Sequence, residues 1–366
     1  MGDTAVKESK ESAELTEAGA ADQLSAWFAG EHAGPRPAAS SVLVQAGGDV
    51  RAVVDAGVLD PGACVFASAS ADLPEGGDLR AVEVEGGVEH SGDELVMTGS
   101  LYVQVFDYGS LPYLSVAGPT VVRVTGPEDY AAFLDDADRA VNDGVWPEGL
   151  THPSVQLADL ATLASPTKAT GLGRLYITAQ GQVRTGVGGQ DLGHVTAGAE
   201  ALRAALDAFA GDPSLGSVVP QDVLRAGAAE RPWLGRYAKA LEVRRRLAPK
   251  YGTDMRVSGF GCRFTDGLPA LPGESTGQVL LVEALGDILA VRTDDYRLFK
   301  LGKGSACLLE VFCALGATSA PDAASDAATA AGSLLGMTAD QALDAYATVT
   351  ARLGLAGPHD VTTGGA

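Results

Sequence analysis

Residues 278–301 read QVLLVEALGDILAVRTDDYRLFKL, and this stretch decides the fold of the C-terminal part of the chain. Residues 278–285 are apolar and β-branched, residues 288–292 return after a Gly286-Asp287 turn, and residues 297–301 alternate polar and apolar side chains. Period-two alternation is typical of a half-buried strand, and Gly-Asp between two such runs is a hairpin signal. The stretch therefore predicts two or three antiparallel strands.

Three helices are expected after these strands. The first begins at Ser305 and carries an apolar stripe, and the second covers residues 325–335. The third begins after Thr338, which forms a capping-box pattern with Gln341, and ends at Gly354. Three strands followed by three helices predict a small winged helix-turn-helix module, so the fold class expected for the whole chain is α+β.

Such modules commonly bind DNA, but the charges here argue against it. The helix that would enter the major groove carries Asp340 and Asp344, and its one basic residue, Arg352, lies near its far end. Carboxylates in the first turns of a recognition helix would repel phosphates. The formal net charge of the chain is -21, which also disfavours nucleic acid and anionic membrane surfaces as partners.

The hairpin, the strand at residues 297–301, the LGKGSACLLE segment and the last two helices resemble a PqqD-like RiPP recognition element. RiPPs are ribosomally made peptides that enzymes later modify. The resemblance implies that the leader segment of a precursor peptide adds as a strand along the third strand, beside a groove against the third helix. The residues that it implies as peptide-binding are Arg297, Leu298, Phe299, Lys300 and Leu301 on the strand and Ala342, Tyr346 and Val349 on the helix.

Alternation assigns Phe299 to one face of its strand but does not say whether that face is open. Phe299, Tyr346 and Val349 therefore have a second interpretation, as plain core residues of a small domain. For Phe299 the two interpretations have equal weight.

Composition limits the compartment and the chemistry. No apolar run approaches membrane-spanning length, and the N-terminus lacks the apolar core of a signal peptide, so we expect a cytoplasmic protein. The four cysteines and five histidines are scattered, without the spacing of a metal or iron–sulfur site. We therefore expect neither a cofactor nor a metal site.

The sequence divides into four expected segments. Residues 1–36 are charged and predict a disordered or docking tail, which includes a short helix over residues 23–28. Residues 37–265 carry short β-like runs and helices and predict an α/β region of one or two subdomains, in which residues 113–125 are expected to form a strand pair. Residues 275–357 form the recognition module, and residues 358–366 form a tail.

No catalytic site can be derived from the motifs. Gly273–Gly277 matches G-x-S-x-G, but a Pro-rich linker precedes it and a strand follows, whereas a nucleophile elbow needs a strand before the serine and a helix after it. Arg244–Arg246 is the one concentration of cationic side chains, and it is more simply a solvated helix end than a ligand site. We therefore expect a non-catalytic protein.

The whole chain resembles the recognition proteins of daptide biosynthesis in three further blocks: YLSVAGPTVVRV at 113–124, HPSVQLADL at 152–160 and RPWLGRY at 231–237. That resemblance implies an adaptor that presents a leader peptide to a dehydrogenase-like oxidative decarboxylase and an aminotransferase. Two other functions stay open: a peptide-modifying enzyme with its site within residues 41–264, and an acidic winged-helix regulator.

Overall fold

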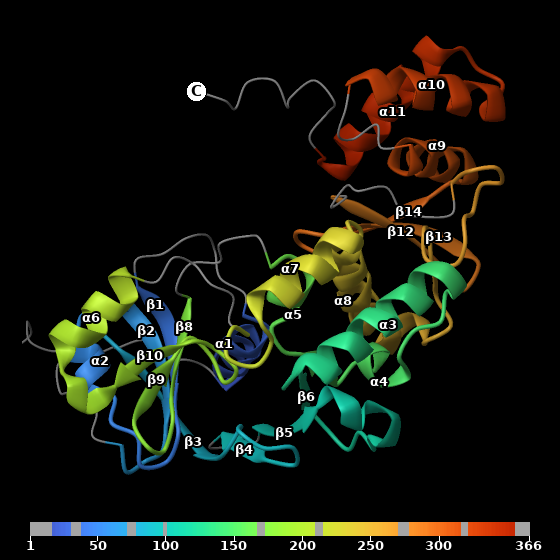
Figure 1. Cartoon of the computed structure of the whole chain (residues 1–366). Coiled ribbons are helices and arrows are strands. Elements are labelled where there is room, and N and C mark those ends of the chain that lie inside the picture. Colours follow the sequence, from blue (N-terminus) through green and yellow to red (C-terminus); the bar gives the residue numbers. More distant parts are fainter. Residues whose placement is uncertain are drawn as a thin grey trace, which may run out of the picture. The chain divides into compact units, whose positions relative to one another are not determined.

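The computed structural model describes residues 17–30, 38–71, 78–97, 101–166, 173–208, 215–269, 278–315 and 321–355. The chain forms two compact units. Unit 1 comprises Met1–Tyr130 and Gln156–Arg225, and unit 2 comprises Ala131–Val155 and Ala226–Ala366. Figure 1 shows a large sheet in the first part of the chain and helices at its C-terminal end, which confirms the expected mixed α+β class.

Unit 1 is built on a mixed sheet of ten strands within the described ranges, in the order β10-β9-β8-β1-β2-β3-β4-β5-β6-β7. Strand β1 pairs in parallel with both β2 and β8, and β2–β3 and β5–β6 are also parallel, whereas the hairpins are antiparallel. The strands are β1 (Ala39–Val44), β2 (Leu59–Ala67), β3 (Arg80–Gly86), β4 (Glu94–Met97), β5 (Leu101–Asp107), β6 (Thr120–Arg123), β7 (Val155–Leu157), β8 (Arg174–Ile177), β9 (Gln182–Arg184) and β10 (Asp191–His194).

One face of this sheet packs on helix α1 (Glu17–Ala29). Leu24, Trp27 and Phe28 of α1 are at most 2% exposed and share one apolar cluster with inward side chains of β1 to β6 and β8. The residues predicted as a tail therefore include a helix that belongs to the core of unit 1, while residues 1–16 and 31–36 lie outside the described part of the chain.

The other face is covered by α2 (Arg51–Asp55) and α6 (Ala199–Asp207), whose apolar side chains join a second cluster that includes Val53 and Leu202. Strand β1 contributes to both clusters, because its successive side chains point to opposite faces. The remaining helices of the described unit are α5 (Leu160–Ala164) and the 3-10 helices η1 (Tyr108–Tyr113) and η2 (Val195–Ala197), and α7 (Gln221–Glu230) begins at its end.

The strand pair predicted over residues 113–125 is wrong. Within this range there is one strand, β6, and the preceding segment through Tyr113 is the 3-10 helix η1. Pro119, within this range, lacks the backbone N–H that a second paired strand would have to donate at that position.

Unit 2 contains a second sheet, which has four strands in the described residues and the order β11-β12-β13-β14. All its pairs are antiparallel. The elements are β11 (Arg256–Val257), β12 (Val279–Ala284), β13 (Asp287–Arg292), β14 (Leu298–Leu301), α3 (Pro127–Asp143, which begins in unit 1), α4 (Glu148–Thr151), α8 (Leu234–Tyr251), α9 (Lys303–Ala314), α10 (Pro321–Leu335) and α11 (Ala339–Leu353).

The hairpin between β12 and β13 differs by one residue from its prediction. Ala284 pairs with Asp287, so Leu285 and Gly286 occupy the turn, with φ of 52° and 80°. Positive φ at both central residues is the requirement of a type I′ turn, whose twist matches that of the strands. Gly286 meets this requirement freely, and Leu285 does so with its side chain 78% exposed.

Strand β14 and the helices follow the predicted order with small differences at their ends. Arg297 lies before β14, because Tyr296 has φ of 59° and interrupts the extended backbone. Helix α9 begins at Lys303 and α10 at Pro321, two and four residues before the predicted starts. The predicted capping box between Thr338 and Gln341 is present at the start of α11.

Both faces of the four-stranded sheet are covered within unit 2. Val279, Leu281 and Ala290 join the apolar cluster of α9, α10 and α11. Leu280 and Val291, whose side chains point to the opposite face, are at most 1% exposed. On this second side lies α8, whose Arg236 and Tyr237 are also buried. The Arg236 guanidinium of α8 donates to the Val279 carbonyl at 3.4 Å.

The β11 edge of this sheet is closed by the segment that precedes the recognition module. Gly261 donates its N–H to the Val141 carbonyl at 2.9 Å, and Phe260 is 1% exposed. The Glu310 carboxylate on α9 accepts from the Ser258 hydroxyl at 2.5 Å and from the Phe264 N–H at 2.8 Å. This segment therefore binds both α3 and α9.

Candidate functional site

The other edge of the small sheet is β14, and no strand of the described chain pairs with its outer side. The Arg292 N–H donates to the Arg297 carbonyl at 3.0 Å, so residues 292 and 297 form a hydrogen-bonded pair. Bonded and non-bonded pairs alternate along an antiparallel ladder. Leu298 and Lys300 lie opposite Val291 and Leu289 in the non-bonded pairs, and their N–H and C=O groups therefore point away from β13.

These outward groups are what an additional strand would use. None of the four groups has a backbone partner among the described residues. An edge strand with unpaired N–H and C=O groups is a template for pairing with another chain. The site residues of β14 thus divide into two kinds, since the backbone of Phe299 and Leu301 is engaged with β13 while that of Leu298 and Lys300 faces outward.

The side chains of β14 alternate between the two faces of the sheet. Phe299 and Leu301 are half-buried and pack against the cluster of α9, α10 and α11. Leu298, which is 38% exposed, and Lys300 point to the other face. Phe299 is therefore neither a fully buried core residue nor a free one, and it remains partly accessible beside the edge of β14.

Helix α11 places its three predicted residues at different depths. Ala342 is fully buried, and Tyr346 is 4% exposed and stacks on Phe312 with ring centroids 3.9 Å apart. Burial raises the pKa of the Tyr346 phenol above its usual range. Val349 is half-buried at the margin of the same cluster. Ala342 and Tyr346 thus form the support of this surface, and Val349 is the residue of the three that is partly accessible.

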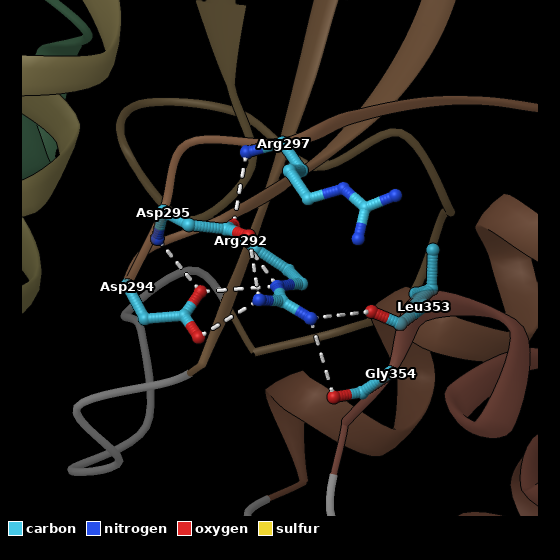
Figure 2. Close-up of polar contacts among 6 residues, drawn as sticks. All are labelled: Arg292, Asp294, Asp295, Arg297, Leu353 and Gly354. Carbon is cyan, nitrogen blue, oxygen red and sulfur yellow. Dashed lines mark hydrogen bonds and ion pairs between the residues drawn. The ribbon is translucent and has the colours of Figure 1, made fainter.

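An arginine fixes the end of α11 to the strand that borders β14. Figure 2 shows the Arg292 guanidinium between the carboxylates of Asp294 and Asp295 and the carbonyls of Leu353 and Gly354. The Asp295 side chain also accepts the Arg297 N–H at 3.1 Å. This network connects the turn before β14 to the last residues of α11, so it holds the two predicted binding elements in one position.

Basic side chains lie along the open edge. The Arg297 guanidinium lies over the Phe299 ring, 5.7 Å from its centroid. The Lys300 ammonium pairs with Asp287 at 2.7 Å, and both of these side chains are well exposed. Asp340 and Asp344 on α11 are exposed as well, which places carboxylates on the helix that would have to approach DNA in a winged-helix regulator.

Unit 1 contains a cavity of about 590 Å³ that our sequence reasoning missed. It is lined by Arg123 at the end of β6, Arg174 at the start of β8, and Arg184 on β9. Arg123 and Arg174 are 7% and 4% exposed. The sequence signal for this cavity is an arginine at one end of an otherwise apolar strand, as in TVVR at 120–123. The sequence does not show that β6 and β8 place their arginines at one cavity.

Two further features concern the described residues: metal-ligand groups and membrane-spanning helices. Among these residues, no group of three or more His, Cys, Asp or Glu side chains is placed to hold a metal ion. None of the helices in the described ranges combines the length and apolar character of a membrane-spanning segment. The predicted tail at 358–366 and the G-x-S-x-G match at Gly273–Gly277 lie outside these ranges.

Comparison of the chain with protein-family models, with curated proteins and with solved structures found no match.

Proposed function

We propose that the chain is a non-catalytic precursor-peptide recognition protein, and that β12–β14 with α9–α11 form a winged helix-turn-helix of the PqqD-like type. The leader of a RiPP precursor adds to β14 as an antiparallel or parallel strand. The observation that supports this most directly is the pair of outward-facing backbone sites at Leu298 and Lys300 on an edge strand.

Specificity in this proposal comes from side chains next to the edge. Apolar leader side chains contact the accessible parts of Phe299, Leu301 and Val349, which are half-buried against the helical cluster. Acidic leader residues pair with Arg297 and with Lys300, whose exposed ammonium exchanges Asp287 for a leader carboxylate. The proposal assigns Ala342 and Tyr346 a supporting role beneath this surface.

The remainder of the chain serves as an adaptor in this proposal. It presents the bound precursor to tailoring enzymes of daptide type, a dehydrogenase-like oxidative decarboxylase and an aminotransferase. The exposed acids Asp340 and Asp344 weigh against the alternative of a DNA-binding regulator.

The test is amide hydrogen exchange, read by NMR, with and without the leader peptide of a candidate RiPP precursor from the same genome. Strand addition must slow exchange at Leu298 and Lys300, whose N–H groups point outward, by at least about tenfold. Phe299 and Leu301 should change far less, because β13 already binds their N–H groups. Binding without protection at Leu298 and Lys300, or no binding at all, would contradict the proposal.

A further inference from the structure

The cavity of unit 1 has the composition of a small-molecule site. Its apolar wall includes Trp27, Phe28, Val187 and Leu215, and its polar groups come from arginine, glutamine and threonine side chains. A volume of about 590 Å³ lies within the range of ligand-binding cavities, which are mainly apolar with a few placed polar groups. All lining residues belong to unit 1, so the cavity can be considered without unit 2.

The Arg174 side chain binds several residues of the cavity wall. Its guanidinium donates to the carbonyls of Trp27 and Phe28 and pairs with the buried Asp159, and its Nε donates to the Thr185 carbonyl at 3.4 Å. The Trp27 ring also lies 5.1 Å from it. Arg174 and Asp159 therefore form a neutral, structural pair.

Arg123 is in a different state, although it is also buried. Its Nη2 donates to the Glu89 carbonyl at 3.0 Å and lies 3.5 Å from the Asp107 carboxylate, but its Nε has no hydrogen-bond partner among the described residues. Burial lowers the pKa of Arg123, an effect that the nearby carboxylates partly offset. The Nε itself is buried within the wall, so Arg123 meets the cavity through other parts of its side chain, as a buried cation whose charge Asp107 only partly offsets.

The charges around the cavity indicate which class of ligand it would bind. Among the lining residues, three arginines exceed the two acids, Asp159 and Glu89, by one positive charge, and Asp107, which pairs with Arg123 without lining the cavity, offsets part of that excess. Arg184 on β9 is half-buried and supplies the second guanidinium that is not part of the Arg174–Asp159 pair. A carboxylate suits the remaining guanidinium groups, because it carries a single negative charge and accepts from guanidinium N–H groups in matched geometry.

We propose that this cavity binds a small organic carboxylate, whose anionic group is held by Arg123 and Arg184 and whose apolar body lies against Trp27 and Phe28. The ligand is a molecule separate from the leader peptide. This site is independent of the strand-addition site on unit 2, so either proposal can fail while the other stands.

The test titrates the full chain with 3-phenylpropionate, hexanoate, phenyl phosphate and the neutral isostere 3-phenylpropanamide. Trp27 is a local reporter, because the chain has three tryptophans and the other two, Trp146 and Trp233, belong to unit 2. We expect a carboxylate to shift the Trp27 indole N–H resonance in NMR spectra, and the amide to bind at least about tenfold more weakly.

Arginine variants test where the carboxylate of the ligand binds. Arg184→Gln should weaken carboxylate binding at least about tenfold, whereas Arg225→Gln, on an exposed part of α7 away from the cavity, should change it less than about twofold. Arg123→Gln should act in the same direction, but Arg184→Gln is the decisive variant because Arg123 also supports the fold through Glu89 and Asp107.

Four results would overturn the proposal. The first is equal binding of 3-phenylpropionate and its amide, and the second is an unchanged affinity in Arg184→Gln. The third is no response of Trp27 to either carboxylate at about 10 mM, where even a millimolar site would be mostly filled. Tighter binding of phenyl phosphate than of the carboxylates would reject the monoanion and assign the site to a phosphate ester.

Discussion

The two edges of the small sheet in unit 2 differ: the β11 edge contacts other segments of the unit, and the β14 edge has backbone groups that point away from the sheet. At β11 the strand is two residues long, and the chain then folds back so that Gly261 and Glu310 connect it to α3 and α9. At β14 the strand has four residues, two of which direct their N–H and C=O groups away from the sheet. Proteins usually protect exposed edges, so an edge that no strand of the described ranges covers, in the same sheet as a closed edge, is a feature that calls for a partner.

The largest effect is expected from disturbing the closed edge. Gly261 has φ of +65°, and a Cβ there would lie 2.1 Å from the Gly144 nitrogen. Gly261→Ala should therefore lower the free energy of unfolding by roughly 4 kcal/mol, since backbone must move on both sides. Urea unfolding followed by tryptophan fluorescence measures this loss, because two of the three tryptophans, Trp146 and Trp233, lie in unit 2 and Trp146 stacks on Tyr237.

The matched control is Gly304→Ala in the first turn of α9. No heavy atom lies within 4 Å of a Cβ at Gly304, and its φ is not positive. This variant should change the same free energy by less than about 1 kcal/mol, in the stabilising direction. Equal losses in both variants would show that the close contact at Gly261 does not hold the β11 edge.

The second largest effect concerns the support beneath the open edge. Tyr346 is buried and stacks on Phe312, so Tyr346→Ala should cost about 3 kcal/mol of folding free energy. Tyr346→Phe keeps the stack and should cost less than about 1 kcal/mol, with leader affinity within about twofold of the original. A leader affinity that collapses in a fully stable Tyr346→Phe would place this side chain in the binding surface instead.

A smaller effect separates the two faces of β14. Phe299→Ala should reduce leader affinity about tenfold, because its ring is half-buried next to the edge, while Leu298→Ala, on the opposite face, should change it less than about threefold. Isothermal titration calorimetry with the leader peptide gives both values. If Leu298→Ala were the more damaging variant, the peptide would contact the other face of the sheet.

The smallest effects are expected from the exposed ion pairs, one at each edge. Arg256 pairs with Glu283 at 2.8 Å beside β11, and Lys300 pairs with Asp287 at 2.7 Å beside β14. Arg256→Ala and Lys300→Ala should each change the free energy of unfolding by less than about 0.5 kcal/mol, because water and salt screen such pairs. A loss above about 1 kcal/mol in the urea experiment would mean that these charges help to define the edges.

Sequence predicted the parts of unit 2 whose signals are local. The β12–β13 hairpin, the alternation of residues 298–301 and the capping box at Thr338 all follow from residues a few positions apart. The turn was misplaced by one residue because Leu285 adopts positive φ, which its side chain does not favour and which the strand register imposes.

What sequence did not predict depends on contacts between distant segments. Strand β1 pairs with β8 through Val42 and Leu175, and the Arg174–Asp159 pair meets the carbonyl of Trp27. The closing contact between Gly261 and the end of α3 is of the same kind. Pattern and propensity describe one segment at a time, so they predicted a short helix over residues 23–28 but neither its place in the core of unit 1 nor the cavity.

The central claim is that a leader peptide forms backbone hydrogen bonds with the outer side of β14, and Lys300 allows a direct test. Lys300→Pro removes the outward N–H and leaves the ladder to β13 intact, while Lys300→Ala removes the same side chain and keeps the N–H. We predict that Lys300→Pro binds the leader peptide at least about tenfold more weakly than Lys300→Ala when both are folded. Equal affinity of these two variants would contradict strand addition at β14.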